Sequence, residues 1–347
     1  KYKNPKITLS PICNNSKFPM TKRLSLQDYI SGIKSSDKRI LGKAITLIES
    51  KKPEHRVIAD QLLKEILPFS GKSVRIGITG VPGAGKSTFI ESFGKYAIEQ
   101  GKKVAVLAID PSSSINKGSI LGDKTRMEEL AKDPNAFIRP SPSSGFLGGI
   151  ANTTFESLLI CEAAGFDYIL IETVGVGQSE TLVNDITDVF LFLKVIGTGD
   201  ELQGIKRGIM EMADLIFINK VNSENLSKAK MTKTELSRAL QFITPKEKNW
   251  KIPVILGSAL EKSGLDEVFN KIDDYISLKI KNGTFLETRK NQAQKRFEFW
   301  VSEYILEKAK NNHHLENSFL AHKKKASELL SNPSSEASDF VNKLFRK

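Results

Sequence analysis

VRIGITGVPGAGKSTFIESFGKYAIEQ, residues 74–100, joins a short apolar run, a glycine-rich turn and a helical pattern. Its centre, Gly80–Ser87, has the spacing Gly-x-x-x-x-Gly-Lys-Ser, in which small residues let successive backbone N–H groups converge on phosphate oxygens. The N-terminus of the following helix adds the positive end of its dipole. A strand, this turn and a helix in this order predict a nucleoside-triphosphate site rather than a structural glycine turn.

Side chains of the same turn supply the remaining chemistry of a phosphate site. Lys86 is expected to neutralise the β- and γ-phosphates, and the hydroxyl of Ser87 to ligate Mg²⁺. The predicted nucleotide contacts of this turn are Gly80, Val81, Pro82, Gly83, Ala84, Gly85, Lys86, Ser87 and Thr88.

After Gly71, short apolar runs rich in β-branched residues alternate with helical stretches. Such runs, bounded by turn residues, are typical of strands that are buried on both faces. We therefore predict an α/β fold, a P-loop NTPase with a mostly parallel sheet flanked by helices. The expected strands are VRIGIT (74–79), KVAVLAI (103–109), FIRPS (137–141), YILIET (168–173), VFLFLKVI (189–196), LIFINK (215–220) and PVILGSA (253–259).

Four regions are predicted along the chain. Residues 1–19 are expected to be irregular, 20–70 to form an N-terminal helical region with Pro53 opening a helix, 71–280 to form the P-loop domain, and 281–347 to form a C-terminal helical region. The last region carries an apolar stripe that must pack either on the main domain or on a second subunit. This stripe consists of Phe297, Trp300, Val301, Tyr304 and Ile305.

Composition excludes several classes of protein. The 347 residues include 2 cysteines and 4 histidines, too few and too scattered for a disulfide scaffold or a zinc cluster, so a reducing compartment is expected. The formal charge of +12 comes from lysines spread over polar faces, which argues against a nucleic-acid partner. No apolar run is long enough for a membrane span. We expect a cytoplasmic protein, or a mitochondrial-matrix protein if the source is eukaryotic.

Carboxylates at the ends of predicted strands are candidate magnesium ligands. Asp110 ends the second strand, Asp123 follows on a Ser/Gly-rich loop, and Glu172 ends the fourth strand. Mg²⁺ prefers oxygen ligands and keeps several waters. We predict a metal set of Ser87, Asp110, Asp123 and Glu172, against the alternative that the carboxylates only cap strand ends or a turn.

The stretch FINKVN, residues 217–222, is similar to the guanine-reading tetrad Asn-Lys-x-Asp, but ends in Asn222. Asn219 and Lys220 are expected to contact the base and ribose, with backbone groups of Ser258, Ala259 and Leu260 nearby. The side-chain amide of residue 222 has one acceptor and one NH₂ donor, so one of the two guanine donors would meet a donor instead of an acceptor. Selectivity for guanine should therefore weaken. A xanthine-type preference, a loss of base discrimination, and a role for Asn222 as a helix N-cap stay open.

Several further blocks carry a family resemblance. GVPGAGKST, DPSSS…GSILGDKTRM, RPSPSSGFLGG, ETVGVGQSE and GTGDELQGIKRGIMEMADL, in this order, resemble the MeaB/ArgK/MMAA family of P-loop GTPases over roughly Leu24 to Lys310. The resemblance implies a homodimeric G-protein chaperone that binds methylmalonyl-CoA mutase, or a related acyl-CoA mutase, and gates loading and protection of its adenosylcobalamin. Older descriptions of the family call its members transport-system kinases for lysine, arginine and ornithine.

By this resemblance, Lys86, Ser87, Asp110, Asp123 and Glu172 are the nucleotide and magnesium residues. Residues 110–126 are similar to switch I, and residues 172–180 to switch II. Gly197–Gly208 is similar to an additional switch, through which the partner and the nucleotide site communicate. Lys206 or Arg207 could swing toward phosphate charge, or could simply form a solvated helix start. We predict catalytic roles for Lys86, Glu172 and Lys206.

Hydrolysis without a partner should be slow. The residue after Gly175, where a Ras-like GTPase carries its water-positioning glutamine, is Val176, and Gln178 is too far along the chain to replace it. Other classes fit less well. A nickel metallochaperone would need a histidine-rich tract or a cysteine pair, and a small-molecule kinase would need an acceptor site. A third alternative is a nucleotide-binding scaffold that does not turn GTP over. Nothing in the sequence resembles a cobalamin motif, so the cobalamin would belong to the partner.

Overall fold

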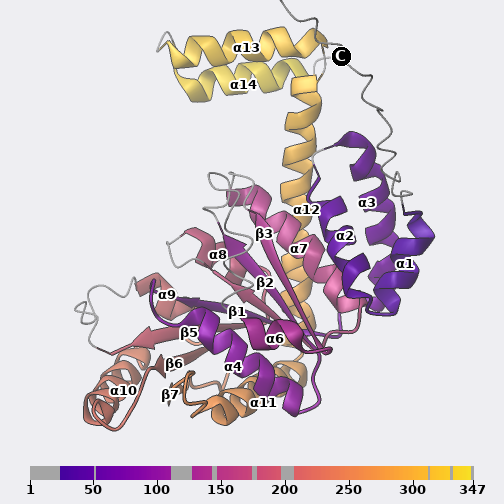
Figure 1. Cartoon of the computed structure of the whole chain (residues 1–347). Coiled ribbons are helices and arrows are strands. Elements are labelled where there is room, and N and C mark those ends of the chain that lie inside the picture. The colour runs from indigo at the N-terminus through magenta and orange to yellow at the C-terminus, as the bar shows by residue number, and fades with distance from the viewer. Residues whose placement is uncertain are drawn as a thin grey trace, which may run out of the picture.

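The computed structural model describes residues 24–50, 52–110, 127–142, 147–173, 178–196, 207–311, 313–328 and 331–344. Across these residues, strands pair in parallel into one 7-stranded sheet of order β3-β2-β4-β1-β5-β6-β7 (Figure 1). The predicted α/β fold is confirmed. The strands are β1 (Val74–Gly80), β2 (Val104–Asp110), β3 (Ala136–Pro142), β4 (Tyr168–Glu172), β5 (Val189–Val195), β6 (Leu215–Asn219) and β7 (Val254–Leu256).

All seven predicted strands are present, but the last is shorter than expected. β7 ends at Leu256 because the chain turns at Gly257, where a Cβ would lie 2.3 Å from the carbonyl oxygen of Ser263. The turn brings Ser258–Leu260 back toward the end of β6, since the N–H of Val221 donates to the carbonyl of Gly257 at 3.1 Å.

Side chains of the sheet alternate between two hydrophobic layers, as strand geometry requires. Leu170 of β4 packs in the layer with α4 (Lys86–Glu99) and α11 (Leu265–Asn282), whereas its neighbours Ile169 and Ile171 pack in the opposite layer with the N-terminal helices. Burial of both faces explains why the strands read as continuous apolar runs. Helices α6 (Glu128–Lys132), α7 (Leu147–Ala163), α8 (Gln178–Asn184), α9 (Arg207–Met212) and α10 (Leu226–Leu240) complete the layers.

The N-terminal helices α1 (Leu26–Lys34), α2 (Lys38–Ile48) and α3 (Pro53–Ile66) begin where their caps predict; the short 3₁₀ turn η1 (Leu67–Phe69) leads into the sheet. Ser25 and Asp28 form a capping box, Asp37 accepts from the first backbone N–H groups of α2, and Pro53 opens α3 as expected. Their apolar faces cover one side of the sheet through residues such as Ile45 and Leu62, both fully buried.

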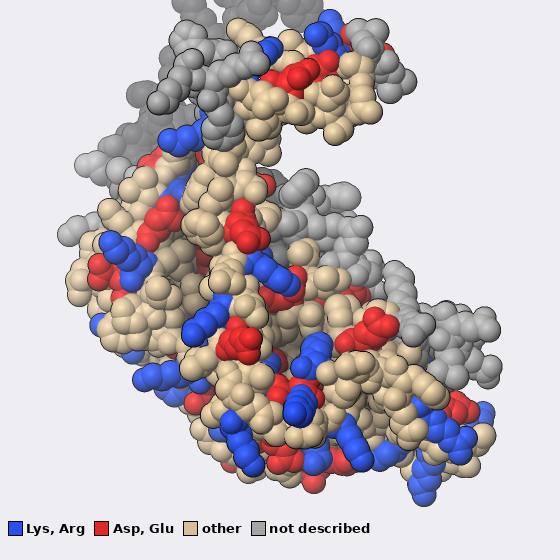
Figure 2. Space-filling model, turned by 180° about the vertical axis from the view of Figure 1, so that it is seen from behind, with Lys and Arg blue, Asp and Glu red and all other residues tan. Residues whose placement is uncertain are grey.

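The C-terminal helices leave the body of the protein. α12 (Thr284–Asn311) extends past the sheet and carries the pair α13 (His313–Ser327) and α14 (Pro333–Leu344) at its far end (Figure 1). Seen from behind, this pair stands off from the body, and a wide hollow lies between them (Figure 2). None of the described helices is long and apolar enough to cross a membrane.

The apolar stripe of α12 divides between two environments. The ring of Trp300 packs against α3, with the guanidinium of Arg56 4.5 Å from its centroid. Phe297, Val301 and Ile305 stay exposed, Phe297 at 70% of its surface. Both predicted destinations of the stripe therefore remain relevant, because one residue covers the N-terminal helices and the others are open to a partner. The limits of the four predicted regions stay a prediction.

Candidate nucleotide site

The predicted phosphate loop joins β1 to α4 and lies at the carboxyl edge of the sheet. Gly83 and Gly85 adopt left-handed φ values of 79° and 84°, which favour glycine. Gly85 also lies so close to Asn219 that a Cβ would stand 2.7 Å from its Nδ2. The loop therefore needs glycine at residue 85 for both conformation and space. α4 starts directly after it, so its N-terminal N–H groups face the loop.

Lys86 is the charged group of this loop. Its Nζ donates to the carbonyl oxygen of Gly80 at 2.8 Å and lies 3.4 Å from that of Val81. Burial lowers the pKa of Lys86, and the nearby carboxylates of Glu172 and Glu180 oppose that shift. A partly desolvated cation held against backbone carbonyls can move to a stronger acceptor, such as a phosphate, at little cost in side-chain solvation.

Ser87 and Glu172 meet across neighbouring elements of the sheet. The hydroxyl of Ser87 donates to Oε1 of Glu172 at 3.1 Å, which joins the start of α4 to the end of β4. β2 lies beside β4 and ends at Asp110, as predicted, although the side chain of Asp110 lies outside the described set. A hydroxyl and a carboxylate at one point of the carboxyl edge are hard oxygen donors of the kind that Mg²⁺ prefers, so the residues present fit this ion.

Asn219 connects the phosphate loop to the predicted base segments. Its Nδ2 donates to the carbonyl of Ala84 at 2.9 Å, and its Oδ1 accepts from the N–H groups of Lys220 at 2.8 Å and Ala259 at 2.9 Å. We predicted that Asn219 contacts the base edge. In the structure its side chain is buried and bonds protein groups at both ends of the amide, so it braces the site from within. The contact with the base stays a prediction.

Asn222 does not cap a helix, contrary to one of the alternatives considered. α10 begins at Leu226, and its N-cap is Asn225. The two asparagines bond reciprocally: the N–H of Asn222 donates to Oδ1 of Asn225 at 2.9 Å, and the N–H of Asn225 donates to Oδ1 of Asn222 at 3.0 Å. This pair closes a turn before the helix. The Asn-x-x-Asn spacing was visible in the sequence, but we had not assigned Asn225 a role.

Several predicted residues fall outside the described part of the chain. Asp123, Val176 and Lys206 are among them, with most of the predicted switch I and of Gly197–Gly208. Arg207 opens α9, but its side chain is also outside. Their predicted roles therefore stay predictions.

Glu180 is a buried residue of this edge that no sequence motif singles out. It lies in the first turn of α8 with 1% of its surface exposed. The only signal in the sequence was its place in ETVGVGQSE, two residues beyond Gln178.

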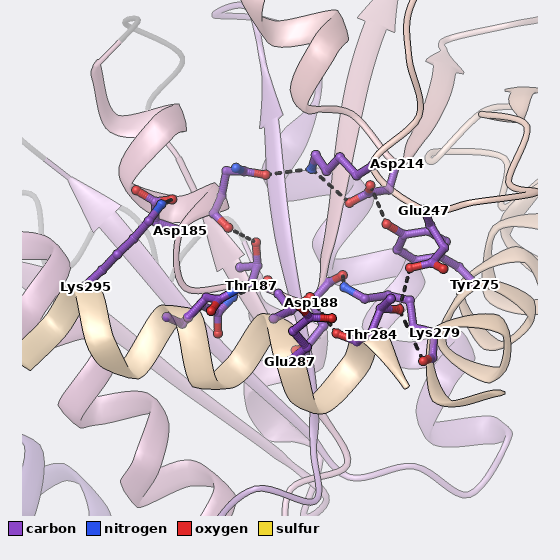
Figure 3. Close-up of a pocket in the computed structure, with 15 residues that line it drawn as sticks. Asp185, Thr187, Asp188, Asp214, Glu247, Tyr275, Lys279, Thr284, Glu287 and Lys295 are labelled. Atoms are coloured by element: carbon purple, nitrogen blue, oxygen red, sulfur yellow. Dashed lines mark hydrogen bonds and ion pairs between the residues drawn. The ribbon is translucent and has the colours of Figure 1, made fainter. Parts of the chain in front are cut away.

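A pocket of about 310 Å³ lies at the opposite edge of the sheet (Figure 3). Its polar groups are engaged with one another: Asp214 accepts from the hydroxyl of Tyr275 at 2.7 Å and pairs with Lys246 at 3.3 Å, while Glu247 accepts from the hydroxyl of Thr284 at 2.5 Å. Asp214 directly precedes β6, so this is the amino edge. The pocket ties α11 and α12 to the sheet and is separate from the phosphate loop.

Comparison with known proteins decides the family. A family model described as "Methylmalonyl Co-A mutase-associated GTPase MeaB" matches residues 41–314. The chain belongs to the MeaB family. The family description and the relatives described as GTPases show that this MeaB-family protein is a GTP-hydrolysing enzyme, as predicted.

Relatives of this MeaB-family chain come from bacteria and animals. A probable GTPase of Mycobacterium tuberculosis (strain ATCC 25618 / H37Rv) is 50% identical over 76% of this chain and 78% of its own length. GTPase ArgK of Escherichia coli (strain K12) is 46% identical over 79% of this chain and 83% of its own. The mitochondrial methylmalonic aciduria type A homolog of Mus musculus is 43% identical over 81% of this chain and 70% of its own.

A solved structure supports the fold at higher coverage. The crystal structure of an LAO/AO transport system kinase matches with a TM-score of 0.72 and 34% identity, over 92% of this chain and 98% of the other. The arrangement of sheet, N-terminal helices and C-terminal helices is therefore shared with a solved relative.

Proposed function

We propose that this MeaB-family GTPase acts as a chaperone for methylmalonyl-CoA mutase or a related acyl-CoA mutase, and that its GTP cycle gates loading and protection of the mutase's adenosylcobalamin. The observation that supports the proposal most is the meeting of Lys86, Ser87 and Glu172 at the carboxyl edge, in a chain whose family model names association with this mutase. Cobalamin would be held by the mutase and not by this chain.

Within the proposed site, each residue has a defined task. Lys86 neutralises the β- and γ-phosphates, and backbone N–H groups of the loop cradle them. Ser87 and Glu172 hold Mg²⁺, with Asp110 and Asp123 as further ligands by resemblance. The ion, when bound, offsets charge that develops on the phosphates. Lys206 adds positive charge from the additional switch.

A homodimer is part of the proposal. The exposed Phe297, Val301 and Ile305 lie on one stripe of α12, which leads to the projecting α13–α14 pair (Figure 1). Burial of such side chains against a second copy would remove apolar surface from water at about 25 cal/mol per Å².

The experiment that tests the chaperone role is phosphate release from GTP with and without purified methylmalonyl-CoA mutase. We expect slow phosphate release by the protein alone, because Val176 offers no hydrogen bond to the attacking water. With the mutase we expect the rate to rise at least tenfold. An unrelated acyl-CoA enzyme serves as the control and should leave the rate unchanged. An identical rate with the mutase and with the control would refute the gating role.

The kinase interpretation survives as a second candidate because of the similarity to the LAO/AO transport system kinase. Labelled γ-phosphate separates the two. Transfer of label to lysine, arginine or ornithine would favour the kinase, whereas release of free phosphate without transfer favours the GTPase cycle.

Selectivity for the base depends on residue 222. Replacing Asn222 with aspartate should raise GTP affinity relative to XTP by roughly ten- to a hundredfold, because a carboxylate accepts from both guanine donors through bonds of about 1.5 to 3 kcal/mol each. Aspartate keeps an oxygen for the N–H of Asn225, so the turn should persist. Competition binding with GTP, XTP and ATP measures the change.

The matched control is Asn135→Asp, an exposed asparagine just before β3 at the amino edge. It adds the same charge far from the base and should leave the GTP-to-XTP ratio unchanged. Equal ratios for the wild type and Asn222→Asp would show that other groups read the base.

A further inference from the structure

Glu180 carries a carboxyl group in an unusual position for a polar side chain. With 1% of the residue exposed, it is enclosed by protein, yet among the residues that the structure describes no hydrogen-bond donor reaches its Oε2. A buried polar atom without a partner costs about 1 to 3 kcal/mol, and more when it is charged. Such a cost is tolerated most often at functional sites, where a ligand or water supplies the missing donor.

α8 follows β4 and begins at the carboxyl edge of the sheet, with Glu180 in its first turn. Val183, one helical turn further on, is fully buried and lies so close to β1 that a Cβ on Gly77 would stand 2.9 Å from its Cγ1. Residues three apart share a helix face, so Glu180 is directed toward the same strand. β1 leads straight into the phosphate loop.

Charge links Glu180 to that loop. Lys86 interacts electrostatically with both Glu172 and Glu180, and both raise its pKa against the effect of burial. Glu172 already accepts from Ser87, at the predicted magnesium position. Glu180 is thus a second carboxylate near the phosphate loop, with an oxygen that is not committed to a described donor.

We propose that Glu180 orients the water that attacks the γ-phosphate of GTP. This rests on the phosphate site proposed above, in which Val176 offers the water no hydrogen bond. The water oxygen forms a bond to the γ-phosphorus, and the bond to the β,γ-bridging oxygen breaks, leaving its electron pair on GDP. Glu180 accepts one proton of the water and returns it to the released phosphate, so the products are GDP and inorganic phosphate.

Glu180→Gln tests this role because it keeps the size of the side chain and removes its charge and basicity. We expect the single-turnover rate of GTP hydrolysis to fall roughly a hundredfold, as for loss of a positioned proton acceptor. Affinity for a fluorescent, non-hydrolysable GTP analogue should change less than about threefold. Glu180→Asp retains the carboxylate and should hydrolyse at least about tenfold faster than Glu180→Gln.

Glu247→Gln is the matched control. Glu247 is also buried, at 3%, but belongs to the pocket at the amino edge, where it accepts from Thr284 (Figure 3). It also accepts from Asn282. It should lose some thermal stability and keep the wild-type rate. A wild-type rate in Glu180→Gln, or losses of rate and analogue affinity of the same size, would overturn the proposal. If Glu180→Gln does not fold, a rate in Glu180→Asp no better than a hundredth of wild type would also count against it. Absence of hydrolysis in the wild type would instead refute the phosphate site itself.

Discussion

Replacing Lys86 with alanine should lower GTP affinity by at least about a hundredfold and bring hydrolysis below detection. Each charge-assisted bond contributes about 1.5 to 3 kcal/mol, and Lys86 is expected to bond two phosphates, so the lost binding energy corresponds to two or more powers of ten. In the structure its Nζ donates to the loop carbonyl of Gly80 and lies 3.4 Å from that of Val81. Titration with fluorescent GTP and a phosphate-release assay measure both effects.

The fold should survive this change. Lys86 occupies the first turn of α4, where alanine is a good helix former. Lys64→Ala, at an exposed position on α3, removes the same charge away from the loop and should leave affinity within twofold. Unchanged GTP affinity in Lys86→Ala, with the chain folded, would refute the assignment of the phosphate loop.

A second large effect is expected on stability, from Arg289→Ala. Arg289 of α12 donates to both carboxylate oxygens of Asp188, at 3.0 and 2.7 Å, and lies 3.5 Å from Glu162. Both carboxylate side chains have 0% exposure. Removing Arg289 takes the ion-pair partner from the buried carboxylate of Asp188, which costs about 3 to 5 kcal/mol, whereas Glu162 keeps its pair with Arg75 at 2.9 Å. Urea unfolding followed by circular dichroism measures the loss.

This loss should not extend to exposed pairs. Lys271→Ala breaks a surface pair with Asp274 and should change the free energy of unfolding by less than about 1 kcal/mol. Similar unfolding midpoints for Arg289→Ala and Lys271→Ala would mean that the cluster of Arg289, Asp188 and Glu162 contributes little, and that α12 is held by its other contacts.

Local patterns were enough to predict most of the sheet. All seven strands were expected within a few residues because burial on both faces leaves an uninterrupted apolar run. The largest error was in PVILGSA, where the expected strand continues past Leu256. Gly257 ends it through a close approach to Ser263, a contact that no periodicity reveals.

The candidate site was predicted in part. The sequence predicts that the phosphate loop and two carboxylates follow the ends of strands. In the structure β1 ends at Gly80, β2 at Asp110 and β4 at Glu172. The internal role of Asn219 was not foreseen, because its bonds to Ala84 and Ala259 join segments that are distant along the chain. Asn222 was considered as an N-cap, but the cap is Asn225, since helix boundaries depend on the turn that precedes them.

The sequence by itself determined the phosphate loop and the parallel sheet, because these depend on short-range spacing and on apolar periodicity, and its motif blocks carried the resemblance to the family. Tertiary structure alone decided which polar groups are buried together. The burial of Glu180 at the start of α8, the charge cluster of Arg289 and the separate pocket at the amino edge all depend on residues that are far apart along the chain. Burial raises the cost of an unpaired charge, and burial is a property of the packed molecule that no local stretch of sequence contains.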